Sequence, residues 1–297
     1  MTTAQDLVNE CRRHIDAGRQ DEHNVLSATI TSGATTFIPT YALGGIQKNK
    51  IVAMELELML VINVDATTST VTVVRGYLGS TAASHASGTL ITVSPVVSDY
   101  QIFQALNEDL DDLSSPLNGL FKISTVGPFT YNISTRGYDL AADVIDIVDV
   151  RYHGLGSPLK RYPKLTRYEI VRGQSATDFP SGVGMIIYSY AAPGQPIVVR
   201  YKAPFTHFSS LTDDASSVAG LGASMMDIPP LGAAIRLIET TEIKRNRTEF
   251  QGEPRRASEV PPGAIRQSTA GLEKRRQVRI QAEAARLFQQ FPTSLRV

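Results

Sequence analysis

The stretch IVAMELELMLVINV (Ile51–Val64) carries the clearest structural signal in the sequence, because apolar residues occupy alternate positions over most of its length. Polar residues, among them Glu55 and Glu57, fall between them. A period of two requires one buried face and one wetter face, which predicts a β-strand. Shorter strand patterns follow at residues 70–75 and 89–93, so we expect a small antiparallel β-domain here.

The sequence on either side changes to the helical period. Apolar residues recur three and four positions apart near the N-terminus, where Cys11 belongs to the apolar stripe, and again over residues 99–113. A third helix is predicted after Asp227, because Asp caps helices well and Pro229 fits the first turn. Between the second and third helices, several strand patterns separated by turn signals indicate a second β-sheet or a sandwich.

These patterns predict an α+β fold with a bundle-like helical core, inserted antiparallel β-domains and an extended C-terminal helical arm. A length of 297 residues suits about two domains and a full hydrophobic core. The predicted parts are a helical core from residues 1–20, 97–119 and 226–251, an inserted β-domain at 21–96, a second β-domain at 120–205, a loop at 206–225, and a Pro-rich linker with the arm helix at 252–297.

The C-terminal part of the sequence has a character of its own. The segment GEPRRASEVPPGA (Gly252–Ala264) is dense in proline, which favours extended and stiff backbone. The helix predicted at residues 270–291 carries basic residues on one side and apolar residues on the other. A helix beyond a stiff linker is badly placed to join the main core, so we expect its apolar side to bind another chain. The alternative is that it folds back on its own domain.

Charge is balanced in total but not along the chain. The 29 Lys and Arg residues equal the 29 Asp and Glu residues, which argues against a uniformly basic nucleic-acid-binding protein. Residues 236–297 hold 13 basic and 7 acidic residues, a net of +6, so residues 1–235 carry −6. An acidic body and a basic tail favour head-to-tail contacts between copies or with partners. The alternative is a solvated basic helix that binds nothing in particular.

The sequence offers no coherent catalytic constellation. The single cysteine, Cys11, leaves no internal disulfide and no cysteine-based zinc site, and its apolar stripe makes it a poor nucleophile. The five histidines are scattered without metal spacing, and we interpret His85 as a structural hydrogen bonder. The loop at residues 153–160 is loosely similar to a phosphate loop but lacks its spacing. We therefore expect no enzyme activity, no cofactor and no metal.

Four aspartates, Asp139, Asp143, Asp146 and Asp149, are the remaining candidates for acid–base chemistry or a cation site. Asp146 lies in the alternating sequence VIDIVDV and is expected to face outward, and Asp143 is expected to cap the preceding turn. The residue order of an EF-hand is absent. The chain also opens without an apolar targeting segment, and its longest apolar stretch is too short to span a bilayer, so we expect no membrane contact.

Two segments resemble proteins of tailed bacteriophages. The first, VVRGYLGSTAASHASGTLI (Val73–Ile91), is similar to a segment that recurs in tailed-phage virion proteins, and its matching residues are Arg75, Gly76, Gly79, Ser80, Ala82, His85 and Gly88. The second, DIPPLGAAIRLIETTEIKRNRTEFQGEPRRASEVPPGA (Asp227–Ala264), resembles the late helix and linker of phage head-to-tail connector (neck adaptor) proteins. Its matching residues are Gly232, Ala233, Ala234, Arg236, Leu237, Arg255, Arg256, Ala257, Glu259, Val260 and Gly263.

The connector resemblance implies a structural protein of the virion neck, made in the host cytoplasm. It implies a homo-oligomeric ring, typically a dodecamer, with the C-terminal arm docked on the portal protein, a stopper or tail protein on the distal side, and DNA passing through. The residues expected to bind the portal or a neighbouring subunit are Arg255, Arg256, Lys274, Arg275, Arg276, Arg279, Ile280, Leu287, Phe288 and Phe291. The apolar members would supply most of the binding free energy, and the arginines would orient the arm.

Packaged DNA would be contacted only nonspecifically, through Arg and Lys, because the basic tail has no aromatic stacking platform. Two other functions stay open. The Val73–Ile91 pattern also fits a tail or baseplate protein. A glycan-binding or hydrolytic β-domain is the third alternative, although the sequence has no Trp, and Tyr41 and Tyr77 alone offer little stacking area.

Overall fold

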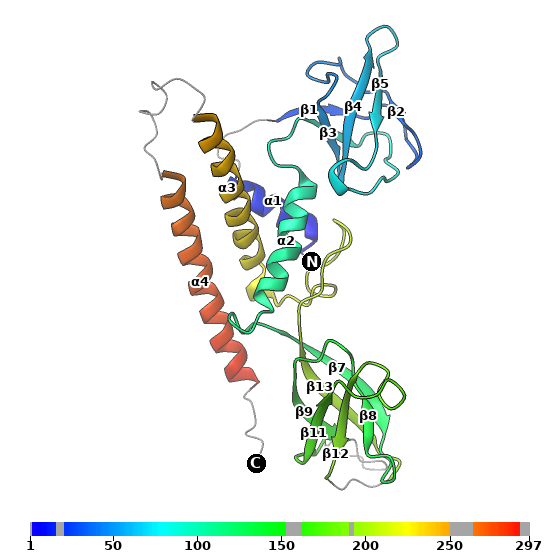
Figure 1. Cartoon of the computed structure of the whole chain (residues 1–297), viewed down its shortest axis with the longest axis vertical. Coiled ribbons are helices and arrows are strands. Elements are labelled where there is room, and N and C mark those ends of the chain that lie inside the picture. Colours follow the sequence, from blue (N-terminus) through cyan, green and yellow to red (C-terminus); the bar gives the residue numbers. More distant parts are fainter. Residues whose placement is uncertain (1, 16–20, 153–161, 190–192, 250–263, 292–297) are drawn as a thin grey trace. The chain divides into compact units, whose positions relative to one another are not determined.

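The structure is a computed structural model that describes residues 2–15, 21–152, 162–189, 193–249 and 264–291 (Figure 1). Contacts divide the chain into two units. The first unit comprises residues 1–109, 208–215 and 225–276. The second unit comprises residues 110–207, 216–224 and 277–297. Each unit is built around one set of antiparallel strands.

The first unit begins with helix α1, Ala4–Ile15. A reciprocal capping box starts the helix: the Thr3 N–H donates to the Asp6 carboxylate at 2.8 Å, and the Asp6 N–H donates to the Thr3 hydroxyl oxygen at 3.3 Å. The apolar stripe of α1 is buried, and the helix contacts α3, Ile228–Glu249. Cys11 is fully buried, as its place in the stripe predicts.

The six strands of the first unit form one antiparallel sheet. They are β1 (Glu22–Val25), β2 (Thr36–Phe37), β3 (Ile51–Met54), β4 (Glu57–Asp65), β5 (Thr70–Val74) and β6 (Leu90–Val93), in the order β1-β6-β3-β4-β5-β2. A bridge between Leu26 and Pro39 continues the two edge strands toward each other, with the Ser27 N–H donating to the Ile38 carbonyl at 3.0 Å. The sheet therefore curls until its edges meet around one apolar core.

The single strand predicted for Ile51–Val64 is wrong, because the stretch is a hairpin. Met54 pairs with Glu57, and the two-residue turn between β3 and β4 places Glu55 in the left-handed region at φ 52°. The turn reverses which residues face inward, and it buries Glu57 where the alternation predicted a wetter face.

Two more helices begin within the first unit: α2, Asp99–Leu113, and α4, Ala264–Gln290, and both extend into the residues of the second unit. The Ser98 hydroxyl caps α2 by accepting from the Gln101 N–H at 3.2 Å, while the Gln101 side chain accepts from the Ser98 N–H at 3.0 Å. Short 3₁₀ turns occur at Tyr77–Gly79 and Ala223–Met225.

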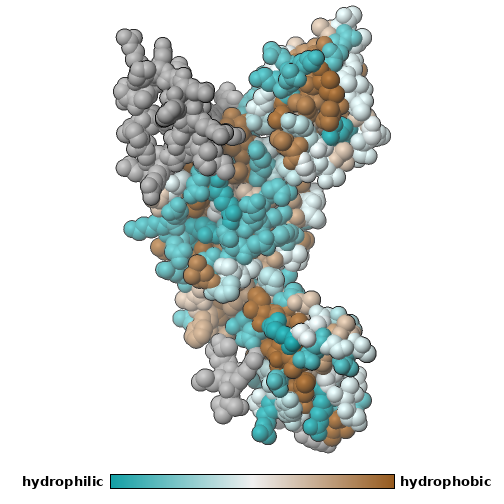
Figure 2. Space-filling model, in the orientation of Figure 1, coloured by the Kyte–Doolittle hydropathy of each residue, from teal (hydrophilic) through white to brown (hydrophobic). Residues whose placement is uncertain are grey.

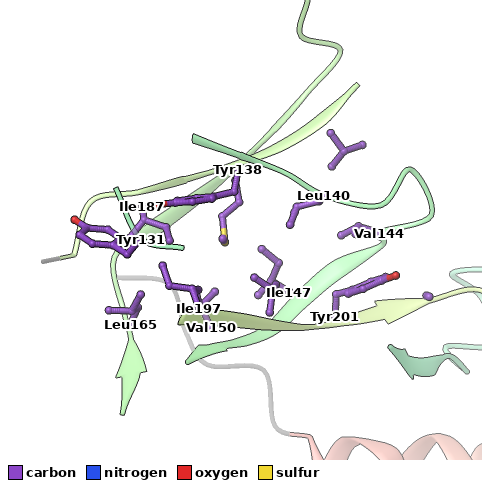
Figure 3. Packing of buried hydrophobic residues seen from close by; sticks show 14 residues of the cluster. Tyr131, Tyr138, Leu140, Val144, Ile147, Val150, Leu165, Ile187, Ile197 and Tyr201 are labelled. Carbon is purple, nitrogen blue, oxygen red and sulfur yellow. The ribbon is translucent and has the colours of Figure 1, made fainter. Parts of the chain in front are cut away.

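The second unit is a sandwich of two antiparallel sheets. One sheet has the order β10-β9-β13-β7 and the other β11-β12-β8. The strands are β7 (Lys122–Thr130), β8 (Gly137–Asp139), β9 (Asp146–Tyr152), β10 (Lys164–Leu165), β11 (Tyr168–Arg172), β12 (Val183–Ile187) and β13 (Pro196–Ala203). Apolar side chains of both sheets meet in one core, with Ile147 and Ile197 on one side and Tyr138 and Ile187 on the other (Figure 3).

The expected fold class, a bundle-like helical core with inserted β-domains, is wrong. Among the described residues, thirteen strands in three antiparallel sheets accompany four α-helices. The strands of each unit form a hydrophobic core of their own. The β-units are therefore the main folded bodies and not insertions into a helical bundle. The predicted helices themselves are present, and α4 starts six residues earlier than the predicted boundary at residue 270.

Candidate functional site

The loop that follows β5 is tied down by a buried charge network centred on Glu57. The Arg75 guanidinium donates to both Glu57 oxygens, from Nε at 2.6 Å and from Nη2 at 2.7 Å. Backbone N–H groups of Gly76 and Ala83 donate to the same carboxylate at 3.2 and 2.9 Å. Burial raises the pKa of Glu57, but these hydrogen bonds and one from His85 outweigh burial and lower the pKa to about 2.

His85 lies between two carboxylates. Its Nε2 is 2.9 Å from Glu57 Oε2, and its Nδ1 is 3.0 Å from Glu55 Oε2. Both ring nitrogens therefore lie within hydrogen-bond distance of a carboxylate oxygen. Arg75 and Glu57 form a buried ion pair, whereas the Glu55 side chain on the other side of His85 is 56 % exposed. The expected structural role of His85 is confirmed.

The network accounts for the polar residues of the Val73–Ile91 segment. Besides Glu57, Arg75 donates to the carbonyl oxygens of Thr31 at 2.9 Å and Ala34 at 2.8 Å. The Ser80 hydroxyl accepts from the Leu58 N–H at 2.9 Å. Gly76, at φ 62°, opens the loop in a conformation that glycine adopts without strain. These residues shape a loop and present no reactive group.

The outer side of the first sheet is apolar across three strands. Ile51 pairs with Leu60, and Leu60 pairs with Val74, so the three side chains form a row across β3, β4 and β5. Val74 is 43 % exposed and its neighbour Ile62 is 42 % exposed. Figure 2 shows an apolar area over this unit, whereas the helical part of the chain is mostly hydrophilic in the same view. An apolar surface area that includes exposed side chains such as Val74 and Ile62 is typical of a surface that contacts another protein.

Helix α4 holds most of the residues predicted to bind a partner, and the structure divides them between two faces. Ile280 and Leu287 are buried by the chain itself, and Arg276 and Arg279 also face it. Lys274, Arg275 and Phe288 are exposed, and Phe291 is half-buried. Arg255 and Arg256 lie outside the described residues.

The inward face of α4 meets α2 and α3 at one ion pair. Arg276 Nη2 donates to Asp109 Oδ1 at 2.6 Å, and both side chains are buried or nearly so. Gly232 of α3 leaves the space for this carboxylate, because a Cβ there would lie 1.8 Å from Asp109 Oδ1. The glycine of the connector-like GAA sequence therefore leaves a small recess, called the notch below, that the Asp109 carboxylate fills. Asp109 lies close in sequence to Glu108, Asp111 and Asp112 of the same helix, and nothing in this acidic cluster marks it as the buried member.

Further along, α4 is held through Glu283, a buried carboxylate that sequence analysis did not single out. The Ser224 hydroxyl donates to it at 3.0 Å, and Arg286 Nε donates at 2.7 Å from one turn away. Arg279 approaches the same carboxylate at 3.7 Å and donates to the Ser224 carbonyl at 2.5 Å. The only signal in the sequence was the helical spacing of Glu283 with Ile280 and Leu287.

The four aspartates of the second unit are structural residues with different partners. Asp149 is buried and paired with Arg200 and Arg151, whose hydrogen bonds outweigh the effect of burial and lower the pKa of Asp149. Asp139 accepts from the Ser181 hydroxyl at 2.9 Å, and Asp143 accepts from the Tyr201 hydroxyl at 3.2 Å. Asp146 Oδ1 accepts from the Ile147 N–H at 2.9 Å. Within the described ranges, no cluster of three His, Cys, Asp or Glu side chains has a geometry that holds a metal ion.

Two further features bear on the sequence predictions. The segment that is loosely similar to a phosphate loop, residues 153–160, lies outside the part of the chain that the structure describes. Of the helices that are described, none combines the length and the apolar character needed to cross a bilayer.

The described residues form two β-units and a C-terminal helix that buries one face on its own chain and exposes apolar and basic residues on the other. No protein-family model matches the sequence, and no curated protein is similar to it.

Proposed function

We propose that this chain is a structural subunit of a tailed-bacteriophage virion, a head-to-tail connector that forms a ring between the portal vertex and the tail. The observation that carries the proposal is the exposed side of α4. Phe288 is 66 % exposed and Val278 is 56 % exposed on a helix that also exposes Lys274 and Arg275. Large exposed apolar side chains on a helix that also exposes basic ones are typical of an anchor for another chain.

The buried network supports a role in assembly for the virion-like segment. Glu57, Arg75 and His85 bond to one another and to backbone groups of the loop. A buried polar network whose members are all hydrogen-bonded holds a loop in one conformation, which suits a subunit of a rigid particle. The segment is equally typical of tail and baseplate proteins, which therefore remain the second candidate.

Portal docking by α4 is the finer part of the proposal. Ile280 and Leu287 fix the helix on its own chain, which presents Phe288 at the C-terminal end of α4 in an ordered position. A helix that is already ordered loses little conformational entropy on binding, so a single exposed aromatic side chain can contribute a large share of the affinity. We expect Phe288 and the half-buried Phe291 to be the portal anchors.

Sedimentation with portal rings from the phage that encodes this chain tests the proposal. The chain should co-sediment with the rings, and Phe288→Glu should weaken binding at least tenfold, which corresponds to about 1.4 kcal/mol. Tyr41→Glu is the matched control, because Tyr41 is 65 % exposed on the first unit and should leave binding unchanged. A chain that does not sediment with portal rings contradicts the connector function. Antibody labelling at the tail tip of virions would then favour the baseplate candidate.

A further inference from the structure

Helix α4 has an inward face that explains how it is held. Its less exposed residues recur at spacings of three and four, namely Thr269, Leu272, Arg276, Ile280, Glu283, Leu287 and Phe291. This period stays close to that of a straight α-helix, so one face contacts the chain along the described length. The side of the helix that carries Lys274, Arg275 and Val278 lies off this face and is exposed.

Helix α2 exposes a face of the opposite charge. Gln101, Gln104, Glu108 and Asp111 recur at spacings of three and four and are all exposed. The side chains of Glu108 and Asp111 are 62 % and 66 % exposed, although Arg236 and His207 of the same chain approach them. Leu117, in the turn that follows α2 directly, is 94 % exposed. The exposed face of α2 therefore carries two carboxylates, each with a hydrogen-bond partner in its own chain, and the turn after α2 exposes one large apolar side chain.

We infer that the basic face of α4 in one copy of the chain binds the acidic face of α2 in the next copy. Lys274 and Arg275 supply two positive charges beside Val278. Glu108 and Asp111 supply two negative charges on α2, and Leu117 is exposed in the turn that follows this helix. The surfaces are complementary in charge and in apolar character, which favours a second copy over an unrelated partner. The zero net charge of the chain, with its acidic and basic parts, fits such self-association.

The contact joins two different faces, so it is heterologous. Each copy uses α4 toward one neighbour and α2 toward the other, which builds a closed ring when the rotation between copies closes and a filament when it does not. The inference rests on the proposed function, because a connector needs a ring, and it names the residues that form the contact. Repetition of the contact around a ring makes the assembly more stable than a single contact between two copies.

Charge reversal in the full chain tests the inference by mass photometry and sedimentation velocity. The basic variant pair Lys274→Glu and Arg275→Glu, made together, should weaken self-association at least tenfold in 50 mM salt. The acidic pair Glu108→Lys and Asp111→Lys should do the same. Because like charges then meet, each variant alone should remain monomeric. The two variants mixed, or all four substitutions in one chain, should restore the oligomer.

The matched control reverses two exposed lysines of the first unit, Lys48→Glu and Lys50→Glu, and should assemble like the unmodified chain. Circular dichroism checks that each variant is folded, and Leu117→Asp supplies a test that does not alter the cis partners of Glu108 and Asp111. The inference is overturned if the basic pair, the acidic pair and Leu117→Asp all leave assembly unchanged. It is also overturned if mixing the basic and acidic variants does not restore the oligomer. A chain that stays monomeric at 50 µM yet sediments with portal rings overturns it too and leaves the proposed function standing. A chain that assembles through these faces and ignores portal rings supports it and contradicts portal docking.

Discussion

Glu57 places a full negative charge inside the first β-unit, and every part of its carboxylate has a donor. Removing an ionised carboxylate from water costs several kcal/mol unless hydrogen bonds and opposite charges replace the water. Arg75 supplies a bidentate pair, two backbone N–H groups approach from the loop, and His85 closes the remaining side. Removing one partner should therefore lower the free energy of unfolding by more than the whole network contributes to it.

Acid should destabilise the first unit through Glu57. Its pKa is lowered from 4.5 to about 2, so the stabilising contribution is complete above about pH 4.5 and disappears as the pH falls through 2. A shift of this size corresponds to about 3 kcal/mol. We expect amides of β4 and β5 to lose protection about a hundredfold between pH 5 and pH 2, measured by hydrogen exchange and corrected for the intrinsic rate.

Replacement of the carboxylate tests the origin of this dependence. Glu57→Gln should be less stable than the unmodified chain at pH 7 and should lose less further stability on acidification, because Glu57 no longer titrates. Asp6, Asp65 and Asp213, whose pKa values are also lowered by local hydrogen bonds, keep the rest of the acid response. Glu273→Gln, in an exposed position of α4, should keep the full acid response. An acid profile that is the same with and without the Glu57 carboxylate would show that other groups cause it.

At the scale of elements, the helices were predictable and the hairpin was not. The helical period located α1, α2 and α3 to within one or two residues, because α1 and α2 each have a continuous buried stripe and α3 buries its first turns. The hairpin at Ile51–Val64 was predicted as one strand because both of its strands carry apolar residues on two faces. The alternation of apolar residues therefore continues through the turn without a break. Glu55 stands at a left-handed position usually occupied by glycine, and no turn signal marks it.

The anchoring of α4 was equally hidden in the sequence. The residues that hold it include a charged pair, Arg276 and Asp109, that lies 167 positions apart in the chain. A pattern-based interpretation assigns arginines to the solvated side of a helix, so Arg276 counted as available for a partner. Only the fold shows that Gly232 opens a notch for the carboxylate.

A side chain at Gly232 should loosen the contact between α2 and α4. In Gly232→Ala, the added methyl group collides with the Asp109 carboxylate and moves it away from Arg276, which leaves two buried charges without each other. We expect a loss of about 3 kcal/mol in the free energy of unfolding, measured by urea titration. The loss should shrink in the Asp109→Ala background, where no carboxylate occupies the notch.

Gly271→Ala is the control for the effect of a methyl group on a helix. No atom lies within 4 Å of the position that its Cβ would take, so the variant should gain up to about 1 kcal/mol from helix propensity. Equal losses in Gly232→Ala with and without Asp109 would mean that the notch does not serve the ion pair.

At the scale of the whole molecule, the order of elements along the chain did not show whether the helices or the sheets form the main folded bodies. Each β-unit is encoded between two helices, so the sequence favours a helical body with insertions. The structure instead gives each set of strands a core of its own, with Val52, Met59 and Ile91 in one and Ile147, Met185 and Ile197 in the other. Sequence patterns locate the strands, but they do not show which apolar residues share a core, because that depends on pairing between distant segments.

Two separate cores predict that damage to one β-unit leaves the other intact. Met59 and Met185 are both fully buried, one in each core, and truncation of a buried methionine costs about 2–5 kcal/mol. We expect Met59→Ala to raise hydrogen exchange in β3–β6 and to leave β7–β13 protected as before, and Met185→Ala to do the reverse. The pair are controls for each other, because residue type, burial and truncation are the same. Exchange that rises equally in both units for either variant would show that the chain unfolds as one cooperative body, and the division into two cores would then have no energetic meaning.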